Sequence, residues 1–146
     1  MISSSCKYGI RAVIYIASRS KNNDKIGIKQ ISHDLNLPTP FLAKILQLLA
    51  KHKILSSSKG PHVGFSLLKD PHDITLLYIV LNIDGKDVFD DCIIHNTTCK
   101  CVDEEKLICP IHNEYYRIRE NLVKLFRSKT IFNVVRLIDK NDEITI

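Results

Sequence analysis

Residues 39–51 read TPFLAKILQLLAK, and this stretch decides the fold. Threonine before proline is typical of a helix start, because Thr39 can cap unpaired N–H groups and Pro40 needs no N–H at the first helical position. Apolar residues then recur at i, i+3, i+4 and i+7, which predicts a helix with one buried face: Leu42, Ile45, Leu46 and Leu49. The outer face keeps a polar and basic set: Lys44, Gln47 and Lys51.

A shorter helix precedes this stretch across a tight turn. It is expected over residues 28–36, and Leu37-Pro38 ends it because a residue before proline avoids helical geometry. Two short helices joined in this way, the second with a polar outer face, form a helix-turn-helix. Another helix is expected before them, over residues 6–20, with an apolar stripe of Ile10, Val13, Ile14 and Ala17.

A basic hairpin follows the helix-turn-helix. Its strands are expected over residues 54–57 and 65–68, since the residues between them include Gly60-Pro61 and Gly64. Lys59 and His62 lie near the tip, where a hairpin can reach phosphates or a groove. A hairpin in this place is a wing, so the predicted fold is mainly α with a small β-hairpin wing.

The C-terminal half combines helices with one long irregular segment. A helix over residues 75–83 is expected to stop at Asp84-Gly85, and a short helix is expected over residues 131–138. Between them a long helix over residues 110–128 carries the heptad spacing of a helix pair: Tyr115, Ile118, Leu122 and Leu125. We therefore predict a winged helix-turn-helix domain over residues 1–85, a cysteine-rich loop over 86–112, and a dimerisation helix with a C-terminal segment over 113–146.

Charge is distributed unevenly along the 146 residues. Residues 1–70 hold 11 Lys and Arg against 3 Asp and Glu, a net charge of 11 − 3 = +8, whereas residues 71–146 hold 10 against 13, a net of −3. The basic half favours a polyanionic partner, although excess lysine also serves solubility alone. No apolar run reaches the roughly 20 residues of a membrane span, and the N-terminus does not resemble a signal peptide. A cytoplasmic protein without a membrane partner is expected.

Four of the five cysteines lie within 18 residues: Cys92, Cys99, Cys101 and Cys109. Such clustering in a cytosolic chain favours metal binding or redox chemistry over structural disulfides. Cys109-x-x-His112 is the sharpest feature, because Pro110 would make Cys109 the N-cap of the long helix, where a thiolate is stabilised. With Cys92 and either Cys99 or Cys101, the set is complete for a tetrahedral metal or a cluster. Cys6 stands apart and is expected to be a small apolar residue of the first helix.

The sequence contains none of the motifs that would indicate an enzyme. The chain has no Cys-x-x-Cys pair, no nucleophile–base motif and no glycine-rich loop for phosphates. A thiol oxidoreductase or a metal hydrolase is therefore disfavoured, and a binding protein is expected.

The arrangement resembles the IscR/NsrR/CymR family of bacterial winged helix-turn-helix transcriptional regulators over roughly residues 1–138. The order and spacing of several pieces together make the resemblance specific. These pieces are Tyr8 with Ile10-Arg11-Ala12, residues 42–49, Ser57-Ser58-Lys59-Gly60-Pro61, Ile83-Asp84-Gly85, and Cys92 followed by Cys109-Pro110-Ile111-His112.

The resemblance implies a homodimer held by the long C-terminal helix and bound to a palindromic duplex, with each recognition helix in a major groove and each wing in a minor groove. By position, Thr39, Phe41 and Lys44 resemble recognition-helix contacts, and Lys59 resembles the basic wing residue. The chemistry of the outer face and the tip adds three candidates: Gln47 for base edges, Lys51 for phosphates, and His62 for a groove or phosphates.

This chain departs from the family pattern at three places. His62-Val63 replaces further wing glycines, and Ala43 stands where some relatives carry an acidic base-reading residue. Lys7 stands where some relatives supply an acidic cluster ligand, which makes His112 the more natural fourth ligand. The operator sequence of a relative therefore does not transfer to this chain.

The resemblance also implies a cofactor and a mode of control. An iron–sulfur cluster, 2Fe-2S rather than 4Fe-4S, would be held by Cys92, Cys99, Cys109 and His112. The protein would act as a repressor, and the state of the cluster would modulate its affinity for DNA. Cys101 is the alternative to Cys99, since nine residues separate Cys99 from Cys109, more than in the resembled cluster-binding members. Three further interpretations stay open: zinc in the same ligands, a metal-free thiol switch, and a repressor of the same fold controlled by a protein partner or a small molecule.

Overall fold

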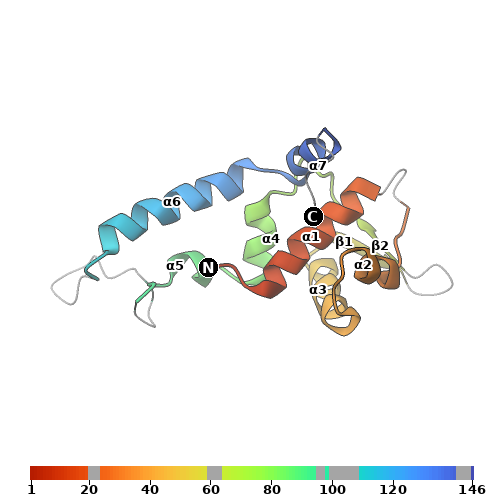
Figure 1. Ribbon diagram of the computed structural model, residues 1–146, viewed down its shortest axis with the longest axis horizontal. Coiled ribbons are helices and arrows are strands. Elements are labelled where there is room, and N and C mark those ends of the chain that lie inside the picture. Colours follow the sequence, from red (N-terminus) through yellow and green to blue (C-terminus); the bar gives the residue numbers. More distant parts are fainter. Residues whose placement is uncertain (20–23, 59–63, 95–97, 99–108, 141–145) are drawn as a thin grey trace.

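The computed structural model describes residues 1–19, 24–58, 64–94, 98, 109–140 and 146 (Figure 1). The fold is mainly helical with one two-stranded antiparallel sheet, as the sequence predicts. In chain order the elements are α1 (Ser4–Arg19), α2 (Ile28–Asp34), α3 (Thr39–Lys51), β1 (Leu55–Ser58), β2 (Gly64–Leu67), α4 (Leu76–Ile83), α5 (Asp87–Asp90), α6 (His112–Ser128) and α7 (Ile131–Asp139).

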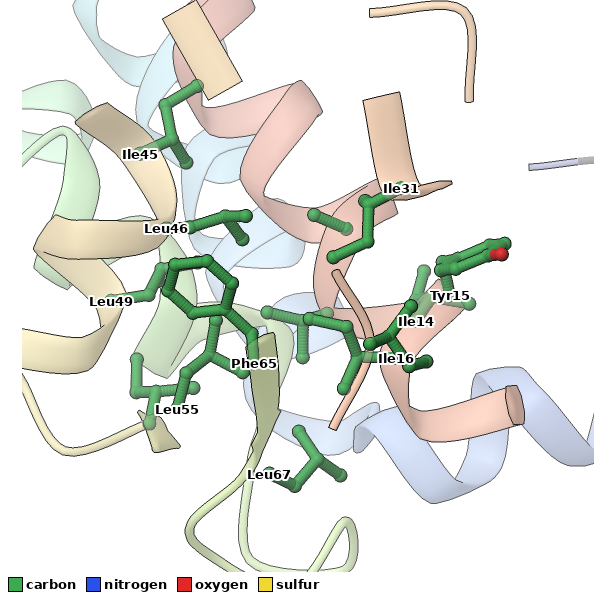
Figure 2. Packing of buried hydrophobic residues seen from close by; sticks show 14 of the residues in the cluster. Ile14, Tyr15, Ile16, Ile31, Ile45, Leu46, Leu49, Leu55, Phe65 and Leu67 are labelled. Carbon is green, nitrogen blue, oxygen red and sulfur yellow. The ribbon is translucent and has the colours of Figure 1, made fainter. Parts of the chain in front are cut away.

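Helix α1 is the centre of the fold. It contacts α2, α3, α4, α7 and β2, and its residues from Ala12 to Ile16 are all buried. Figure 2 shows Ile14 and Ile16 of this helix beside Ile31 of α2 and Phe65 of β2. Because a helix surrounded on most sides must be apolar on most sides, the predicted narrow stripe on the first helix widens to five consecutive buried residues.

The hairpin packs against the helices through its second strand. β1 and β2 pair in register from Leu55 with Leu67 to Ser58 with Gly64, and every residue of β2 is buried. Ile26 adds a short bridge beside β2, where its backbone N and O each form a 2.9 Å hydrogen bond with Phe65. The base of the wing is thus fixed to the segment that enters α2.

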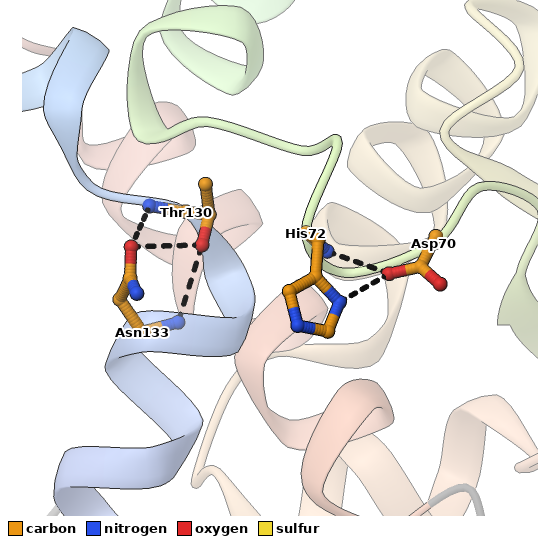
Figure 3. Close-up of polar contacts among 4 residues, drawn as sticks. All are labelled: Asp70, His72, Thr130 and Asn133. Carbon is orange, nitrogen blue, oxygen red and sulfur yellow. Dashed lines mark hydrogen bonds and ion pairs between the residues drawn. The ribbon is translucent and has the colours of Figure 1, made fainter.

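Helix α7 folds back onto α1 and begins with a full capping box. The Thr130 hydroxyl oxygen accepts a hydrogen bond from the backbone N of Asn133, whose side chain accepts one from the backbone N of Thr130 (Figure 3). Beside it, the imidazole of His72 stacks on the ring of Phe132 and contacts Asp70 at 2.6 Å. These contacts attach the connection between β2 and α4 to α7.

Helix α6 extends away from the body formed by the other helices (Figure 1). It contacts α4 through its second half, and none of its described side chains is buried within one chain. Three apolar side chains are left with large exposed fractions: Ile118 at 65%, Leu122 at 37% and Leu125 at 49%. A long helix with an uncovered apolar seam is characteristic of a surface that meets another helix.

Three local predictions need correction. Residues 86–111 are not irregular throughout, because Asp87–Asp90 forms the one-turn helix α5. The long helix starts at His112 with Ile111 as its N-cap, so Cys109 is not the N-cap. Thr39 is the first residue of α3 and Pro38 is the N-cap, one position earlier than predicted. Among the helices of the described part, none is both long and apolar enough to span a membrane.

Candidate nucleic-acid interface and cysteine segment

The turn between α2 and α3 is closed by backbone hydrogen bonds. Asn36 adopts a left-handed conformation with φ of 51°, which reverses the chain, and asparagine tolerates this region better than most residues. The backbone N of Leu37 then donates a 2.9 Å hydrogen bond to the carbonyl oxygen of Ser32, and the Leu37 side chain is buried. The turn is therefore a fixed corner between the two helices.

Two hydroxyl groups join the helices across this corner. The Ser32 hydroxyl donates a 2.5 Å hydrogen bond to the carbonyl oxygen of Leu37 and lies 2.7 Å from the Thr39 hydroxyl. Thr39 is half-buried, and its hydroxyl contacts α2 in place of capping its own helix. This contact explains why Pro38 takes the N-cap position, where its carbonyl oxygen accepts from the backbone N of Leu42 at 2.9 Å.

Two side chains of α1 hold the end of α2. The Arg11 guanidinium donates a 2.9 Å hydrogen bond to the carbonyl oxygen of Leu35, and the Tyr15 hydroxyl donates one to the Asp34 carboxylate. Hydrogen bonds from His33 and then Tyr15 hold the pKa of Asp34 below its ordinary value. Burial, followed by the bond to Asp34, raises the pKa of Tyr15. Since both donors come from one face of α1, the helix-turn-helix is fixed to the centre of the fold.

The outer face of α3 is exposed and free of carboxylates. Lys44, Gln47 and Lys51 are all exposed, while the four apolar residues of the opposite face are buried, as the spacing predicts. Phe41 is 41% exposed, and its ring packs edge-on against Tyr8 with the centroids 5.8 Å apart. Cationic and amide side chains thus project from a helix whose other face is held in the core, an arrangement suited to reading a polyanionic groove.

Only the base of the wing belongs to the described residues. Lys59 and His62, the two candidates at its tip, lie outside them. At the base, Lys53 has a φ of 57° and turns the chain from α3 into β1, and its side chain is exposed. The hairpin therefore leaves the C-terminal end of α3 with a further lysine beside it.

The cysteine-rich loop of residues 86–112, called the cysteine segment from here on, lies only partly within the described residues. Cys92 and His112 are half-buried and Cys109 is buried, whereas Cys99 and Cys101 lie outside the described residues. The two described cysteines of this segment are thiols. Among the described residues, no three His, Cys, Asp or Glu side chains are grouped closely enough to hold a metal ion.

The ends of the segment are attached to neighbouring structure. Asp91, which precedes Cys92, forms an isolated antiparallel bridge with Thr98, which precedes Cys99. At the other end the backbone N of His112 donates a 2.9 Å hydrogen bond to the carbonyl oxygen of Cys109. This turn, and not a helical N-cap, joins the two residues of the Cys-x-x-His motif, so the predicted thiolate stabilisation by the helix start loses its structural basis.

Sequence reasoning missed the residues that position the helix-turn-helix. Arg11 and Tyr15 do not stand out in an apolar periodicity, yet they lie at i and i+4 and so share one face of α1. The residue types could have indicated this role, because an arginine or a tyrosine on a buried helix needs hydrogen-bond partners for its polar end. Their partners are a backbone carbonyl oxygen and a carboxylate, both at the C-terminal end of α2.

Known proteins are similar to this chain in both sequence and fold. The sequence profile of Rrf2, described as an iron-dependent transcriptional regulator, matches residues 2–137. A protein of Aquifex aeolicus named as an HTH-type transcriptional regulator is 27% identical over 142 residues, which cover 97% of this chain and 95% of that one. The HTH-type transcriptional regulator NsrR of Halalkalibacterium halodurans is 29% identical over 94 residues, 63% of each chain.

Solved structures agree on the architecture. CymR, the global cysteine regulator of B. subtilis, superposes with a TM-score of 0.75 at 22% identity over 94% of this chain and 97% of that one. IscR of T. potens superposes with a TM-score of 0.74 at 16% identity over 100% of this chain and 93% of that one. These identities support the shared fold, and the profile supports the family, whose members regulate transcription by binding DNA and are not enzymes. The chain belongs to the Rrf2 family of winged helix-turn-helix transcriptional regulators.

Proposed function

We propose that this regulator, most simply a repressor, binds a palindromic duplex as a homodimer through the outer face of α3 and the wing. One observation carries the proposal: Lys44, Gln47 and Lys51 are exposed on one face of a helix whose opposite face is buried. The two lysines neutralise phosphates independently of sequence, and Gln47 offers a donor and an acceptor to base edges. Thr39 and Phe41 stand at the start of the same helix, where one contacts Ser32 and the other Tyr8.

The two wing candidates belong to the same proposed contact with DNA. Lys59 and His62 follow β1, which begins just beyond α3, and exposed Lys53 lies at the junction. A recognition helix and an adjacent hairpin can contact neighbouring parts of one duplex, and the phosphate contacts then fix the register of the helix. We assign Lys59 to the phosphate backbone of the DNA and His62 to the edge of its groove.

The second copy of the chain would meet the uncovered seam of α6. Ile118, Leu122 and Leu125 are exposed at heptad spacing, and half-buried Tyr115 starts the series. Covering apolar surface contributes roughly 25 cal/mol per Å², which favours pairing of two such helices. A symmetric pair would present two α3 helices, as a palindromic site requires.

The donor set of the cysteine segment fits an iron–sulfur cluster, 2Fe-2S in preference to 4Fe-4S. Cys92, Cys109 and His112, with Cys99 or alternatively Cys101, would hold it, and bound iron would supply one-electron redox chemistry. The bridge between Asp91 and Thr98 supports Cys99, because it draws together the residues that precede Cys92 and Cys99. The described ligands are not grouped in advance, so binding would have to reorder the segment.

Reordering is the step that would change DNA affinity. The segment lies between α4 and α6, so a new arrangement there alters how α6 is held relative to the body. In a homodimer α6 sets the distance between the two α3 helices, and this distance must match the groove spacing of the operator. A ligand that favours one arrangement therefore shifts operator affinity by its differential affinity for the two.

The experiment begins with anaerobic purification, an absorption spectrum, and iron and sulfide analysis. A duplex enriched by the protein from a random library then serves as the operator, and its affinity is compared for cluster-loaded, cluster-free and Cys92→Ala protein. We expect a visible chromophore and an affinity that differs between the loaded protein and the other two. Equal operator affinity in all three states would show that the cysteine segment does not control binding.

Metal analysis separates the alternatives. Stoichiometric zinc without sulfide would replace the cluster by a zinc site in the same ligands. A colourless, metal-free protein that binds the operator and takes up no cluster anaerobically would indicate control by a protein partner or a small molecule.

A further inference from the structure

A second, small hydrophobic cluster joins α1, α4 and α5. Its buried members are Cys6, Leu77, Val80 and Phe89. Phe89 is 7% exposed, although it lies on a helix of four residues and only three positions before Cys92. Figure 1 places α5 close to the N-terminal end of α1. The cluster therefore anchors the first end of the cysteine segment in the body of the protein.

Helix α6 covers the other side of Phe89. The rings of Phe89 and Phe126 meet edge-on with their centroids 6.2 Å apart, and Val123 packs against the same cluster. Seven residues beyond the start of α6, the Arg119 guanidinium donates a 3.4 Å hydrogen bond to the carbonyl oxygen of Asp90. Phe89 is thus held between α1 and the helix that follows Cys109.

The cluster continues into the contact between α1 and α3. Ile10 and Ile83 pack against both this cluster and the main core. A Cβ placed on Gly9 would lie 2.3 Å from Cδ1 of Ile83 and 3.2 Å from Cγ2 of Ile45, which belongs to the buried face of α3. The glycine permits this close approach, and close-packed side chains transmit a displacement because they have no free volume to absorb it.

The turn before α5 is attached to α1 as well. The backbone N and the hydroxyl of Ser3 donate to the Asp84 carboxylate at 2.7 and 2.5 Å. Asp84 is the C-cap of α4, and Gly85 follows it with a φ of 79°. The start of α1 and the start of the cysteine segment are therefore held at the same point.

We propose that Phe89 is a positioning residue that couples the cysteine segment to α3 through the cluster around Cys6 and through Ile83 and Ile45, which both lie against Gly9 of α1. The inference rests on the proposed function, in which the segment reorders. When the chain around Cys92 takes its other arrangement, Phe89 changes its packing in the cluster. Packed cores switch between discrete arrangements, so Ile83 and α1 shift together and α3 changes its tilt.

The test compares Phe89→Leu with Ile131→Val, a matched control in the core at the start of α7, where Ile131 is buried but does not belong to this cluster. Each protein is loaded anaerobically with ferrous iron and sulfide, and its operator affinity is divided by that of its Cys92→Ala form. For the unmodified chain and for Ile131→Val we expect a ratio that differs from one by about 5-fold or more. For Phe89→Leu we expect a ratio within about twofold of one, with operator binding retained.

A second readout uses Cys6 as a reporter and needs no metal. The other four cysteines are replaced by alanine, and the rate of Cys6 labelling by an aromatic disulfide is measured with and without the operator. Because coupling is reciprocal, operator binding should change the labelling rate severalfold, and Phe89→Leu should remove this dependence. Hydrogen exchange of the Ile131 amide under the same two conditions measures how far operator binding suppresses global opening by mass action, and the change in Cys6 labelling is compared with it.

The outcomes separate the two proposals. If the affinity ratio departs from one and Phe89→Leu leaves it unchanged, Phe89 is not the coupling residue and the proposed function stands. If the ratio is one for every protein, the proposed control of DNA binding by the cysteine segment fails, and Cys6 labelling decides the coupling. Labelling that responds to the operator only when Phe89 is present supports the coupling, whereas labelling that ignores the operator overturns it.

Discussion

The Arg11 guanidinium donates a 2.9 Å hydrogen bond to the carbonyl oxygen of Leu35, the residue that closes α2. The same nitrogen lies 3.3 Å from the carbonyl oxygen of Ile146. One side chain of the central helix therefore holds the corner of the helix-turn-helix. The orientation of α3 depends on a polar contact as well as on the apolar core, and this dependence can be measured.

Replacing Arg11 by Met should keep the packing of the aliphatic stem and remove the hydrogen bonds. We expect the free energy of unfolding to fall by about 1–3 kcal/mol, since a partly buried carbonyl oxygen loses a charged donor. Operator affinity should fall as well, because the corner before α3 is loosened. Chemical denaturation and a binding titration measure the two effects, and unchanged values of both would show that Arg11 has no positioning role.

Gly9→Ala should destabilise the protein although alanine is the better helix former. The new Cβ would lie 2.3 Å from Cδ1 of Ile83, which must rotate away, and 3.2 Å from Cγ2 of buried Ile45, and overpacking of this kind costs about 1–3 kcal/mol. The gain in helix propensity is about 1 kcal/mol, so the net loss in the free energy of unfolding should be at most about 2 kcal/mol.

The control for Gly9→Ala is a substitution of Ile83, the residue that the new Cβ would meet. Ile83→Val removes the Cδ1 atom itself, so the double variant should recover part of the stability lost in Gly9→Ala. Additive losses in the double-mutant cycle would contradict the close approach of α1 and α4 at this point.

Asp34 should make stability depend on acid pH. Hydrogen bonds from His33 and Tyr15 lower its pKa below 3.8, so the folded chain holds this proton less tightly than the unfolded chain. The stabilisation is present above the ordinary pKa and is lost as the pH falls through the lowered one. The free energy of unfolding, measured by denaturation at a series of acid pH values, should therefore fall less steeply with decreasing pH for Asp34→Asn than for the unmodified chain. Identical pH profiles of the two proteins would rule out this contribution.

Leu122→Glu should disrupt the proposed dimer without unfolding the chain. Leu122 is exposed in the single chain, so a carboxylate there costs little until a second α6 covers it. We expect the dimer dissociation constant to rise at least about tenfold, as measured by sedimentation equilibrium. Leu137→Glu, on the exposed face of α7, is the matched control. Equal dissociation constants for both variants would place the dimer contact elsewhere.

The helix-turn-helix was predictable because local and tertiary preferences agree there. The i, i+3, i+4, i+7 spacing of α3 predicts its buried face, and all four residues are buried. Glycine and proline at the hairpin loop likewise predicted two short strands, and both form within one residue of the expected positions.

Tertiary contacts decide the features that the sequence did not reveal. The helix α5 has four residues, too few for an apolar period, and exists because Phe89 packs against Cys6 and Phe126. Cys6 itself was predicted as a small apolar residue, and its complete burial confirms this and raises the pKa of the thiol to about 12. The shift of the α3 cap from Thr39 to Pro38 follows from the Ser32 hydroxyl, which no local pattern in α3 contains.

The salt dependence of operator binding tests the central claim most directly. The logarithm of the association constant is measured against the logarithm of salt concentration for the unmodified chain, Lys44→Ala, Lys51→Ala and Lys140→Ala, the last an exposed lysine at the end of α7. If α3 presents both lysines to phosphates, each of the first two variants should reduce the slope by about 0.9 per protomer, and Lys140→Ala should leave it unchanged. A slope that is the same in all four proteins would contradict the assignment of α3 to the DNA.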